Sequence, residues 1–390
     1  MAKLKEIGQS IVNTTHPGLK TDDDAPPRRW IMNVGGGTTD VNGLGTWDAT
    51  SALGPSVVNR ERNAKTMYTD FGELPRYDTW HSSMTAIHGG IPQLCNLTSH
   101  LAKVTAQISD PNATFAGSIT GAYYLPPDFS GVISIDYEAW NPYWEGCCGA
   151  HAALYLNTSI SLQRKLTPGL NSTKTQRRAI ESFQSAALGF WVHTVRAVRA
   201  LRPKASVGIY NWPNFRGDWD AAELQARGNF MLPFYREVNS FQPSVYIGRT
   251  NTTVGTVERV TSCVRDSAML AQRLALDAPG VTAARVHAFA WYRYNRPHAP
   301  FLSQIDFEIE MVEPFNAGAD AVLIWGYELS AQNKSDAIAF LNSHKDMFKT
   351  RLNTQRYGHL KSNDVEISPA LTSDKALTPI SSPQASTAVG

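Results

Sequence analysis

The segment Asp136-Tyr137-Glu138 carries the residue types best suited to chemistry in this sequence. It follows the apolar run 131–135, which is typical of a buried β-strand. Residues i and i+2 of a strand project to the same face, so both carboxyl groups are expected on one side. Two neighbouring carboxyls disfavour double ionisation, and apolar surroundings raise their pKa further. One acid would then stay protonated near neutral pH and could protonate a leaving oxygen, such as a glycosidic oxygen.

We assign Glu138 as the general acid of this pair and Asp136 as its partner. The alternative is that both are ordinary loop residues that cap a helix or meet an arginine, which is the usual meaning of an isolated D-x-E sequence. Trp140 and Trp144 follow closely and argue against that alternative. Aromatic rings beside paired acids suit a sugar-binding site.

The elements that must position these acids alternate along the chain. Short β-rich runs cover 30–34, 66–68, 131–137, 205–211, 244–247, 286–292 and 321–325. Helical periodicity covers 92–108, 175–201, 221–238, 257–276, 304–317 and 335–348. The alternation predicts an α/β fold with a parallel sheet, covered on its outside and either open or closed into a barrel. In a parallel barrel, the chemistry lies at the C-terminal ends of the strands.

Composition divides the chain and excludes several classes of protein. Residues 1–27 read as a polar N-terminal arm, 28–350 as a single domain that contains the candidate catalytic acids, and 351–390 as a Ser/Thr/Pro-rich tail. The 390 residues contain 36 Lys+Arg and 34 Asp+Glu, and a net charge of +2 gives no field suited to nucleic acid. No run of 18 apolar residues exists, so no membrane span is predicted. Phosphate-loop, zinc-site and nucleophile-elbow motifs are absent, so we expect no metal and no cofactor.

Five segments, in order along the chain, resemble segments of the animal and venom hyaluronidases (glycoside hydrolase family 56). They are HGGIPQ at 88–93 with LTSHLAK at 97–103, PPDFSGVISIDYEAWNPYW at 126–144, LRPKASVGIY at 201–210, PSVY at 243–246 and GADAVLIWG at 318–326. Each match is modest, but five in the family's order are specific. The resemblance implies a distorted TIM-like (β/α)7 barrel.

The resemblance also implies the reaction and its residues. It points to a retaining endo-β-N-acetylhexosaminidase that hydrolyses hyaluronan, or chondroitin, as a hyaluronoglucosaminidase-like glycoside hydrolase. In that family the substrate's own acetamido oxygen attacks the anomeric carbon, so Glu138 alone serves as acid/base while Asp136 polarises the acetamido group. The substrate-binding residues implied or suggested by position are Tyr210, Tyr246, Trp325, Trp140 and Tyr292. The expected partner is a polysaccharide, bound by a monomer.

Several departures from the family pattern leave the polymer undecided. Asn141 stands where the family has arginine, Val207 replaces a tryptophan, and Tyr327 and Glu328 replace small hydroxyl residues. A groove for an anionic polymer needs cations near the strand ends; the candidates are Arg202, Lys204, Arg216, Arg249, Arg293 and Arg296. Two alternatives therefore stay open: a glycosidase for neutral N-acetylglucosamine polymers, and a non-catalytic carbohydrate-binding protein.

The signals for cellular compartment conflict. Seven N-x-S/T sequons, more than chance predicts, and the family resemblance favour a secreted, extracellular glycoprotein. The first 20 residues, however, lack the apolar segment of a signal peptide. The four cysteines are too few for a dense disulfide framework, and those of the family's usual disulfides have no counterparts.

Overall fold

The computed structural model describes residues 28–34, 48–59, 63–79, 84–113, 121–214, 221–248, 253–277, 282–295, 299–326, 328 and 330–348. The arm predicted over 1–27 and the tail predicted over 351–390 lie outside the described residues, so both assignments stay predictions. None of the helices in the described ranges is long and apolar enough to cross a membrane.

Strands and helices alternate along the described chain. The strands are β1 (Arg29–Val34), β2 (Val57–Asn59), β3 (Ala64–Met67), β4 (Arg76–Tyr77), β5 (Ala86–Ile87), β6 (Val132–Ile135), β7 (Ser206–Ile209), β8 (Ser240–Phe241), β9 (Arg285–Trp291) and β10 (Ala321–Gly326). The helices are α2 (Ala49–Leu53), η3 (Pro92–Leu94), α3 (Leu97–Ser109), η4 (Gly149–His151), α4 (Ala152–Leu166), α5 (Ser172–Leu201), α6 (Ala221–Tyr235), α7 (Thr253–Asp277), α8 (Gln304–Asn316) and α9 (Ala331–Ser343).

The parallel strands form two sheets that follow the order of a barrel. One sheet has the order β2-β1-β10-β9-β8 and the other the order β3-β6-β7. The first strand pairs in parallel with the last, β1 with β10, as the closing pair of a barrel does. A parallel bridge between Tyr210 and Gln242 links the end of β7 to the segment after β8. In the described part of the chain no ladder joins β3 to β1 or β2, so the ring of hydrogen bonds is not closed there.

The predicted α/β class and the seven interleaved parallel strands are confirmed, with some differences in detail. The strand expected over 244–247 begins earlier, as β8, and pairs further on only through the bridge between Ser244 and Phe289. The short strands β2, β4 and β5 and the helices α2 and α4 were not predicted. Their apolar residues are too few or too irregularly spaced to give a clear period.

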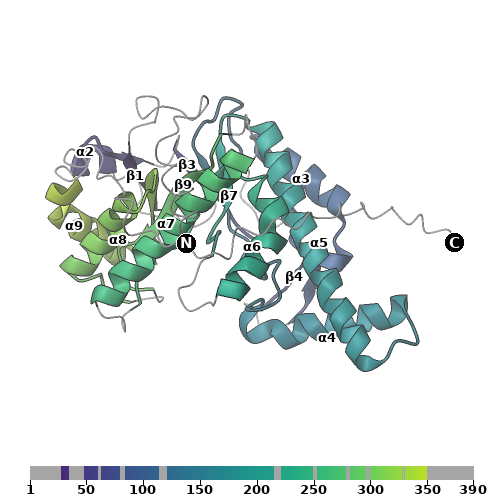
Figure 1. Cartoon of the computed structure of the whole chain (residues 1–390). Helices are drawn as coiled ribbons and strands as arrows, with labels where there is room; N and C mark the ends of the chain where they lie inside the picture. Colours follow the sequence, from purple (N-terminus) through teal and green to yellow (C-terminus); the bar gives the residue numbers. More distant parts are fainter. Residues whose placement is uncertain are drawn as a thin grey trace.

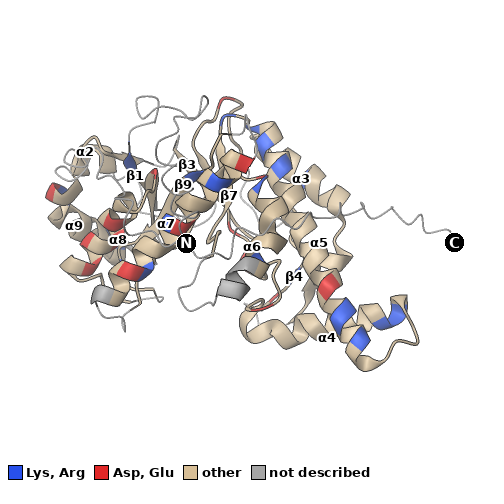
Figure 2. Cartoon of the chain, in the orientation of Figure 1, with Lys and Arg blue, Asp and Glu red and all other residues tan. Residues whose placement is uncertain are grey.

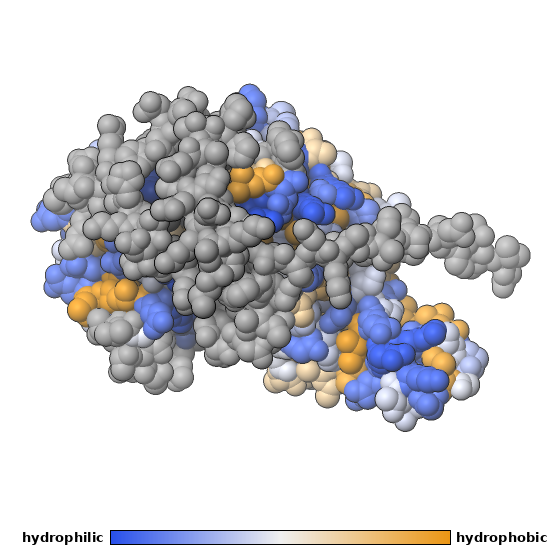
Figure 3. Space-filling view, in the orientation of Figure 1, coloured by the Kyte–Doolittle hydropathy of each residue, from blue (hydrophilic) through white to orange (hydrophobic). Residues whose placement is uncertain are grey.

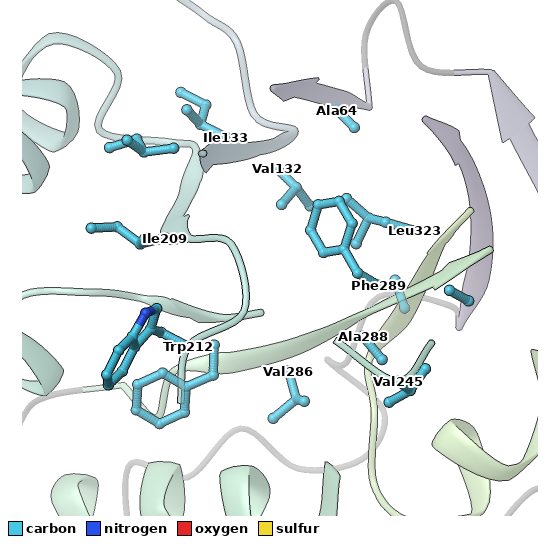
Figure 4. Packing of buried hydrophobic residues seen from close by; sticks show 14 of the residues in the cluster. Ala64, Val132, Ile133, Ile209, Trp212, Val245, Val286, Ala288, Phe289 and Leu323 are labelled. Carbon is cyan, nitrogen blue, oxygen red and sulfur yellow. The ribbon is translucent and has the colours of Figure 1, made fainter. Parts of the chain in front are cut away.

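The strands are buried because their continuous apolar runs face packed side chains on both sides. All four residues of β6 and all four of β7 are buried. Figure 4 shows Val132, Phe289 and Leu323, from β6, β9 and β10, gathered between the two sheets, while Ile133 and Ile209 point away from them. Burying one side chain of this size stabilises the fold by about 1.5–3 kcal/mol. The packed interior therefore fixes the strand ends on which the site residues lie.

Helices cover the outside of the sheets and begin at polar caps. In Figure 1, α7, α8 and α9 lie on one side of the molecule, and α3, α5 and α6 on the other. The side chains of Asn96, Asn171, Ser303 and Ser330 accept from backbone amides in the first turns of α3, α5, α8 and α9. Such caps satisfy N–H groups that have no partner within the helix.

Helices α4 and α5 form a hairpin that projects from the body of the molecule (Figure 1). Lys and Arg gather near its tip (Figure 2), and the surface there mixes hydrophilic with apolar residues (Figure 3). The described cations are Arg164, Lys165, Lys174, Arg177 and Arg178.

Helix α4 contains the run Asn-Thr-Ser-Ile-Ser, whose side chains compete for backbone hydrogen bonds and obscure a helical pattern.

Candidate active site

The candidate site lies where the parallel strands end. Asp136 directly follows β6, Tyr210 directly follows β7, and Trp325 is the penultimate residue of β10. Tyr246 lies past β8, where the chain still runs beside β9: the Val245 amide donates to the Phe289 carbonyl over 2.9 Å. C-terminal strand ends meet on one face of a parallel barrel, so these positions share that face.

The two carboxyl groups differ in their access to water. The backbone amide of Asp136 continues the ladder and donates to the Met67 carbonyl over 2.7 Å, which fixes the position of the residue. The side chain of Asp136 is half-buried, and its buried Oδ1 has no hydrogen-bond partner among the described residues. Glu138 reaches solvent. A buried carboxyl oxygen without a partner is costly, which is typical of a group that awaits a ligand.

The surrounding protein raises the pKa of both acids. Burial is the main cause for Asp136, and repulsion by Glu138 adds to it, so the pKa of Asp136 lies well above its usual range. Partial removal of water also raises the pKa of Glu138. The pair therefore titrates as a unit that keeps a proton to higher pH than free carboxyls do. The sequence-based expectation of an acid that stays protonated agrees with this direction.

Two tyrosines face the acids. Burial raises the pKa of Tyr210, the charges of Glu138 and Asp136 raise it further, and its hydroxyl donates to the Ser244 Oγ over 3.4 Å. Burial also raises the pKa of Tyr246, and the neighbouring Tyr210 and the charge of Asp136 raise it further. Both phenols therefore remain protonated hydrogen-bond donors in the range where the acids titrate.

Aromatic rings form a wall beside these tyrosines. The ring centroids of Tyr210 and Tyr246 lie 6.2 Å apart, and those of Tyr246 and Trp325 lie 6.3 Å apart. Trp291, at the end of β9, completes the wall at 4.9 Å from Trp325 and 5.9 Å from Tyr246. The Trp325 indole N–H donates to the hydroxyl of Tyr68, which directly follows β3, over 3.4 Å. Such a wall presents ring faces and edges of the kind that pack on sugars.

Sequence reasoning missed Trp291, Tyr68 and Ser244, all of which lie at or just after a strand. Trp291 is the register partner of Trp325 in the parallel pairing of β9 and β10, so it lies on the same face of the sheet. That pairing was the missing information, because the sequence shows an aromatic pair without showing which ring faces the site.

Two residues predicted to bind substrate have their side chains packed in the core. Trp140 is 2% exposed, donates its indole N–H to the Pro75 carbonyl over 2.6 Å, and packs on Trp191. Tyr292 is fully buried and lies against Gly326, where any side chain at position 326 would meet the Tyr292 hydroxyl. Both side chains contribute to the core, and their role in substrate binding stays a prediction.

The cations suggested for polymer binding are mostly engaged in other contacts. Arg202 is 4% exposed, and its guanidinium donates to the carbonyls of Leu125, Leu201 and Ile108. Lys204 is exposed but precedes β7, at the strand end opposite to the acids. Arg293 forms a buried ion pair with Glu328, with Nε 2.8 Å from Oε1. Arg216, Arg249 and Arg296 lie outside the described residues.

Within the described ranges, no three His, Cys, Asp or Glu side chains gather in a way that could hold a metal ion. Cys147 and Cys148, neighbours in the loop after Glu138, form a disulfide, whereas Cys95 and Cys263 are free. The groups that the described strand ends bring to this site are the carboxyl groups of Asp136 and Glu138, the phenols of Tyr210 and Tyr246 and the indoles of Trp291 and Trp325.

Comparison with known proteins identifies the family of the chain. The family profile described as hyaluronidase, glycoside hydrolase family 56, matches residues 53–354. A hyaluronidase from Vespa magnifica is 27% identical over 269 residues, which cover 67% of this chain and 70% of the wasp protein.

Two solved structures share the fold. The crystal structure of bee venom hyaluronidase superposes with a TM-score of 0.64 at 23% identity and covers 81% of this chain and 97% of that chain. Bee venom hyaluronidase in complex with a hyaluronic acid tetramer gives a TM-score of 0.61 at 25% identity, over 75% of this chain and 88% of that one. Since the family profile spans most of the 390 residues, and the paired acids lie within the matched range, this chain belongs to the hyaluronidase family of glycoside hydrolases.

Proposed function

We propose that this protein is a retaining endo-β-N-acetylhexosaminidase that hydrolyses hyaluronan by substrate-assisted catalysis. The observation that carries the proposal is the pairing of a buried, unpartnered oxygen on Asp136 with the solvent-accessible carboxyl of Glu138. An acetamido N–H of the substrate would supply the partner that Asp136 Oδ1 lacks. The neighbouring Glu138 would remain free to exchange protons with the leaving oxygen and with water.

The proposed reaction assigns one role to each side chain. Glu138 protonates the glycosidic oxygen while the substrate's acetamido oxygen attacks the anomeric carbon, and the same carboxylate then activates the water that opens the cyclic intermediate. Asp136 accepts from the acetamido N–H and stabilises the positive charge that develops on that group. Tyr210 and Tyr246 donate to sugar oxygens, and Trp325 packs on the acetamido methyl or on a sugar face.

The choice of polymer is the less determined part of the proposal. Binding of a hyaluronic acid tetramer by the bee venom relative supports hyaluronan as the substrate. The engagement of Arg202 and Arg293 in structural contacts supports a second candidate, a glycosidase for neutral N-acetylglucosamine polymers. A groove for an anionic chain would draw on free cations, and these two arginines do not provide them.

Reducing-end release from hyaluronan, chondroitin and chitin oligomers tests both candidates in one assay. The parent protein should cleave hyaluronan, and Glu138→Gln should lower turnover by about 10²–10⁴-fold. Glu145→Gln, at an exposed acid in the same loop, is the matched control and should keep parent activity. Undiminished turnover in Glu138→Gln would refute the assignment of the acid. Binding without turnover by the parent would favour a carbohydrate-binding protein.

We further propose that the protein is a secreted, glycosylated monomer. Four sequon asparagines, Asn96, Asn112, Asn157 and Asn171, are exposed to solvent, where a glycan can be attached. All side chains of the proposed site come from one chain, so no second copy is needed. Treatment with a glycosidase that removes N-glycans, followed by gel filtration of protein from a secreting host, tests both points. An unchanged mass after the treatment would contradict glycosylation.

A further inference from the structure

The two parallel segments that carry Tyr246 and Trp291 stop bonding to each other through their main chains where they reach the candidate site. Before that level they are joined by regular main-chain bonds: the Phe289 amide donates to the Pro243 carbonyl over 2.8 Å, and the Val245 amide to the Phe289 carbonyl over 2.9 Å. In a regular parallel ladder, the amides two residues further along would bond to carbonyls of the facing segment. Those amides belong to Trp291 and Ile247.

Both of these amides donate instead to one side chain, Glu310. Its Oε1 accepts from the Trp291 amide over 2.5 Å, and its Oε2 accepts from the Ile247 amide over 3.0 Å. Glu310 comes from α8, on the outside of the sheet, and is fully buried. Its carboxyl group thus occupies the place of the next ladder rung, with one oxygen for each segment.

The surroundings of Glu310 fit a fixed, bonded carboxyl group. Burial holds the pKa of Glu310 well above its usual range and outweighs the two amides and the charge of Arg259, which lower it, and Asp306 on the same helix raises it further. Arg259, from α7, donates in turn to the carbonyl of Tyr246. The main chain on both sides of the Tyr246 side chain is therefore tied, at its carbonyl and at the next amide.

We propose that Glu310 is a positioning residue that sets the separation of Tyr246 and Trp291 and thereby the shape of the aromatic wall. The ring centroids of Tyr246 and Trp291 lie 5.9 Å apart, and both face Trp325. If the two segments closed into a regular ladder or spread further, the Tyr246 hydroxyl would shift relative to Asp136. The consequence for catalysis rests on the proposed function, whereas the effect on ring geometry does not.

A carboxyl group is specifically required, because both of its oxygens accept. Glutamine presents one oxygen and one NH₂ group, and the NH₂ group cannot accept from a backbone amide. Glu310→Gln therefore leaves one buried amide without a partner and releases one of the two segments. Asp320 offers a matched control, since its Oδ2 accepts from the Val286 amide over 2.7 Å at the opposite end of the same strand, β9. Asp320→Asn makes the same change from carboxyl to amide far along the strand from the aromatic wall, but its remaining oxygen can still accept from the single amide that Asp320 binds.

The test compares Glu310→Gln with Asp320→Asn below the onset of unfolding of each protein. Near-ultraviolet circular dichroism reports the coupling of Tyr246, Trp291 and Trp325 and requires no substrate. We expect Glu310→Gln to change this spectrum and to lower kcat on hyaluronan about 10- to 100-fold with little change in KM. Asp320→Asn should keep both the spectrum and the kcat of the parent.

A spectrum and kcat equal to those of the parent in Glu310→Gln would overturn the proposal, as would equal changes in both variants. If Glu310→Gln does not fold, Glu310→Asp serves instead, because it keeps the carboxyl group but withdraws it by one methylene. It should change the spectrum in the same sense with a smaller loss of stability, and a parent-like spectrum would overturn the proposal. If the parent protein has no activity on hyaluronan, the proposed function fails, but the spectrum still tests whether Glu310 positions the aromatic rings.

Discussion

Substitution of Asp136 by asparagine should make the protein more stable and less active. In the folded protein burial, and next the charge of Glu138, hold the pKa of Asp136 well above its usual range. Below the ordinary aspartate pKa, about 3.9, the folded and unfolded chains are both protonated at this position and the cost is absent. As the pH rises, the unfolded chain releases the proton first, so the stability of the parent falls until the folded-state pKa is passed. Asparagine removes this penalty.

The size of the gain follows from the charge, because asparagine keeps a polar group at this position but does not ionise. A buried polar atom without a hydrogen bond, such as Oδ1, costs about 1–3 kcal/mol, and more when it is charged, so we expect removal of the charge to be worth about 1–3 kcal/mol. In a domain of about 300 residues this corresponds to a rise in Tm of about 2–5 °C. The gain should be present at pH 7 and should vanish near pH 3.5, while turnover at its optimum falls by about 10²-fold or more, as for other groups that stabilise developing charge.

Thermal unfolding of the parent, of Asp136→Asn and of Asp128→Asn at both pH values measures this effect. Asp128 is exposed and precedes the same strand, so its substitution should leave Tm unchanged at either pH. The reasoning would be refuted if Asp136→Asn had a lower Tm than the parent at pH 7, or if its gain in Tm were equally large at pH 3.5. Either result would show that ionisation of this carboxyl group does not destabilise the free protein.

Three other substitutions separate groups of the site from groups of the scaffold. Tyr246→Phe removes the hydroxyl next to Tyr210 that is proposed to donate to the sugar, and it should lower kcat about tenfold with an unchanged Tm; a parent-like kcat would speak against a role for that hydroxyl. Glu328→Gln leaves the largely buried Arg293 guanidinium without its ion-pair partner, so the unfolding free energy should fall by about 3–5 kcal/mol. Denaturant titration measures this loss, and a loss below about 1 kcal/mol would contradict the prediction. Arg202→Met removes the donor of three backbone carbonyls and should lower the unfolding free energy by about 2–4 kcal/mol. The KM for hyaluronan should equal that of the parent, and a raised KM would show that Arg202 contacts the polymer.

Much of the scaffold and the centre of the site could be predicted from the sequence. The acids could be placed because a two-residue spacing after an apolar strand has a single geometric meaning. Tyr210 and Trp325 could be placed at strand ends because continuous apolar runs precede them. The long helices α5 and α7 could be found from their 3.6-residue period.

The remaining differences arise where the sequence does not determine the direction in which a side chain points. Trp291 and Tyr292 are neighbours, so they project to opposite faces, and only the pairing of β9 with β10 decides that Trp291 faces the wall. Trp140 is adjacent to the acids in sequence, yet its ring fills the space against Trp191. Glu310 has no motif at all, because its two partners are backbone amides distant in sequence. Information of this kind exists only once the elements are packed.

The stereochemistry of the first-formed product tests the central claim most directly. Proton NMR during cleavage of a hyaluronan oligomer reports the new reducing-end sugar before it mutarotates. Two successive displacements, the first by the substrate's own acetamido group, predict that the β-anomer appears first. Initial appearance of the α-anomer would mean direct attack by water and would contradict the roles given to Asp136 and Glu138.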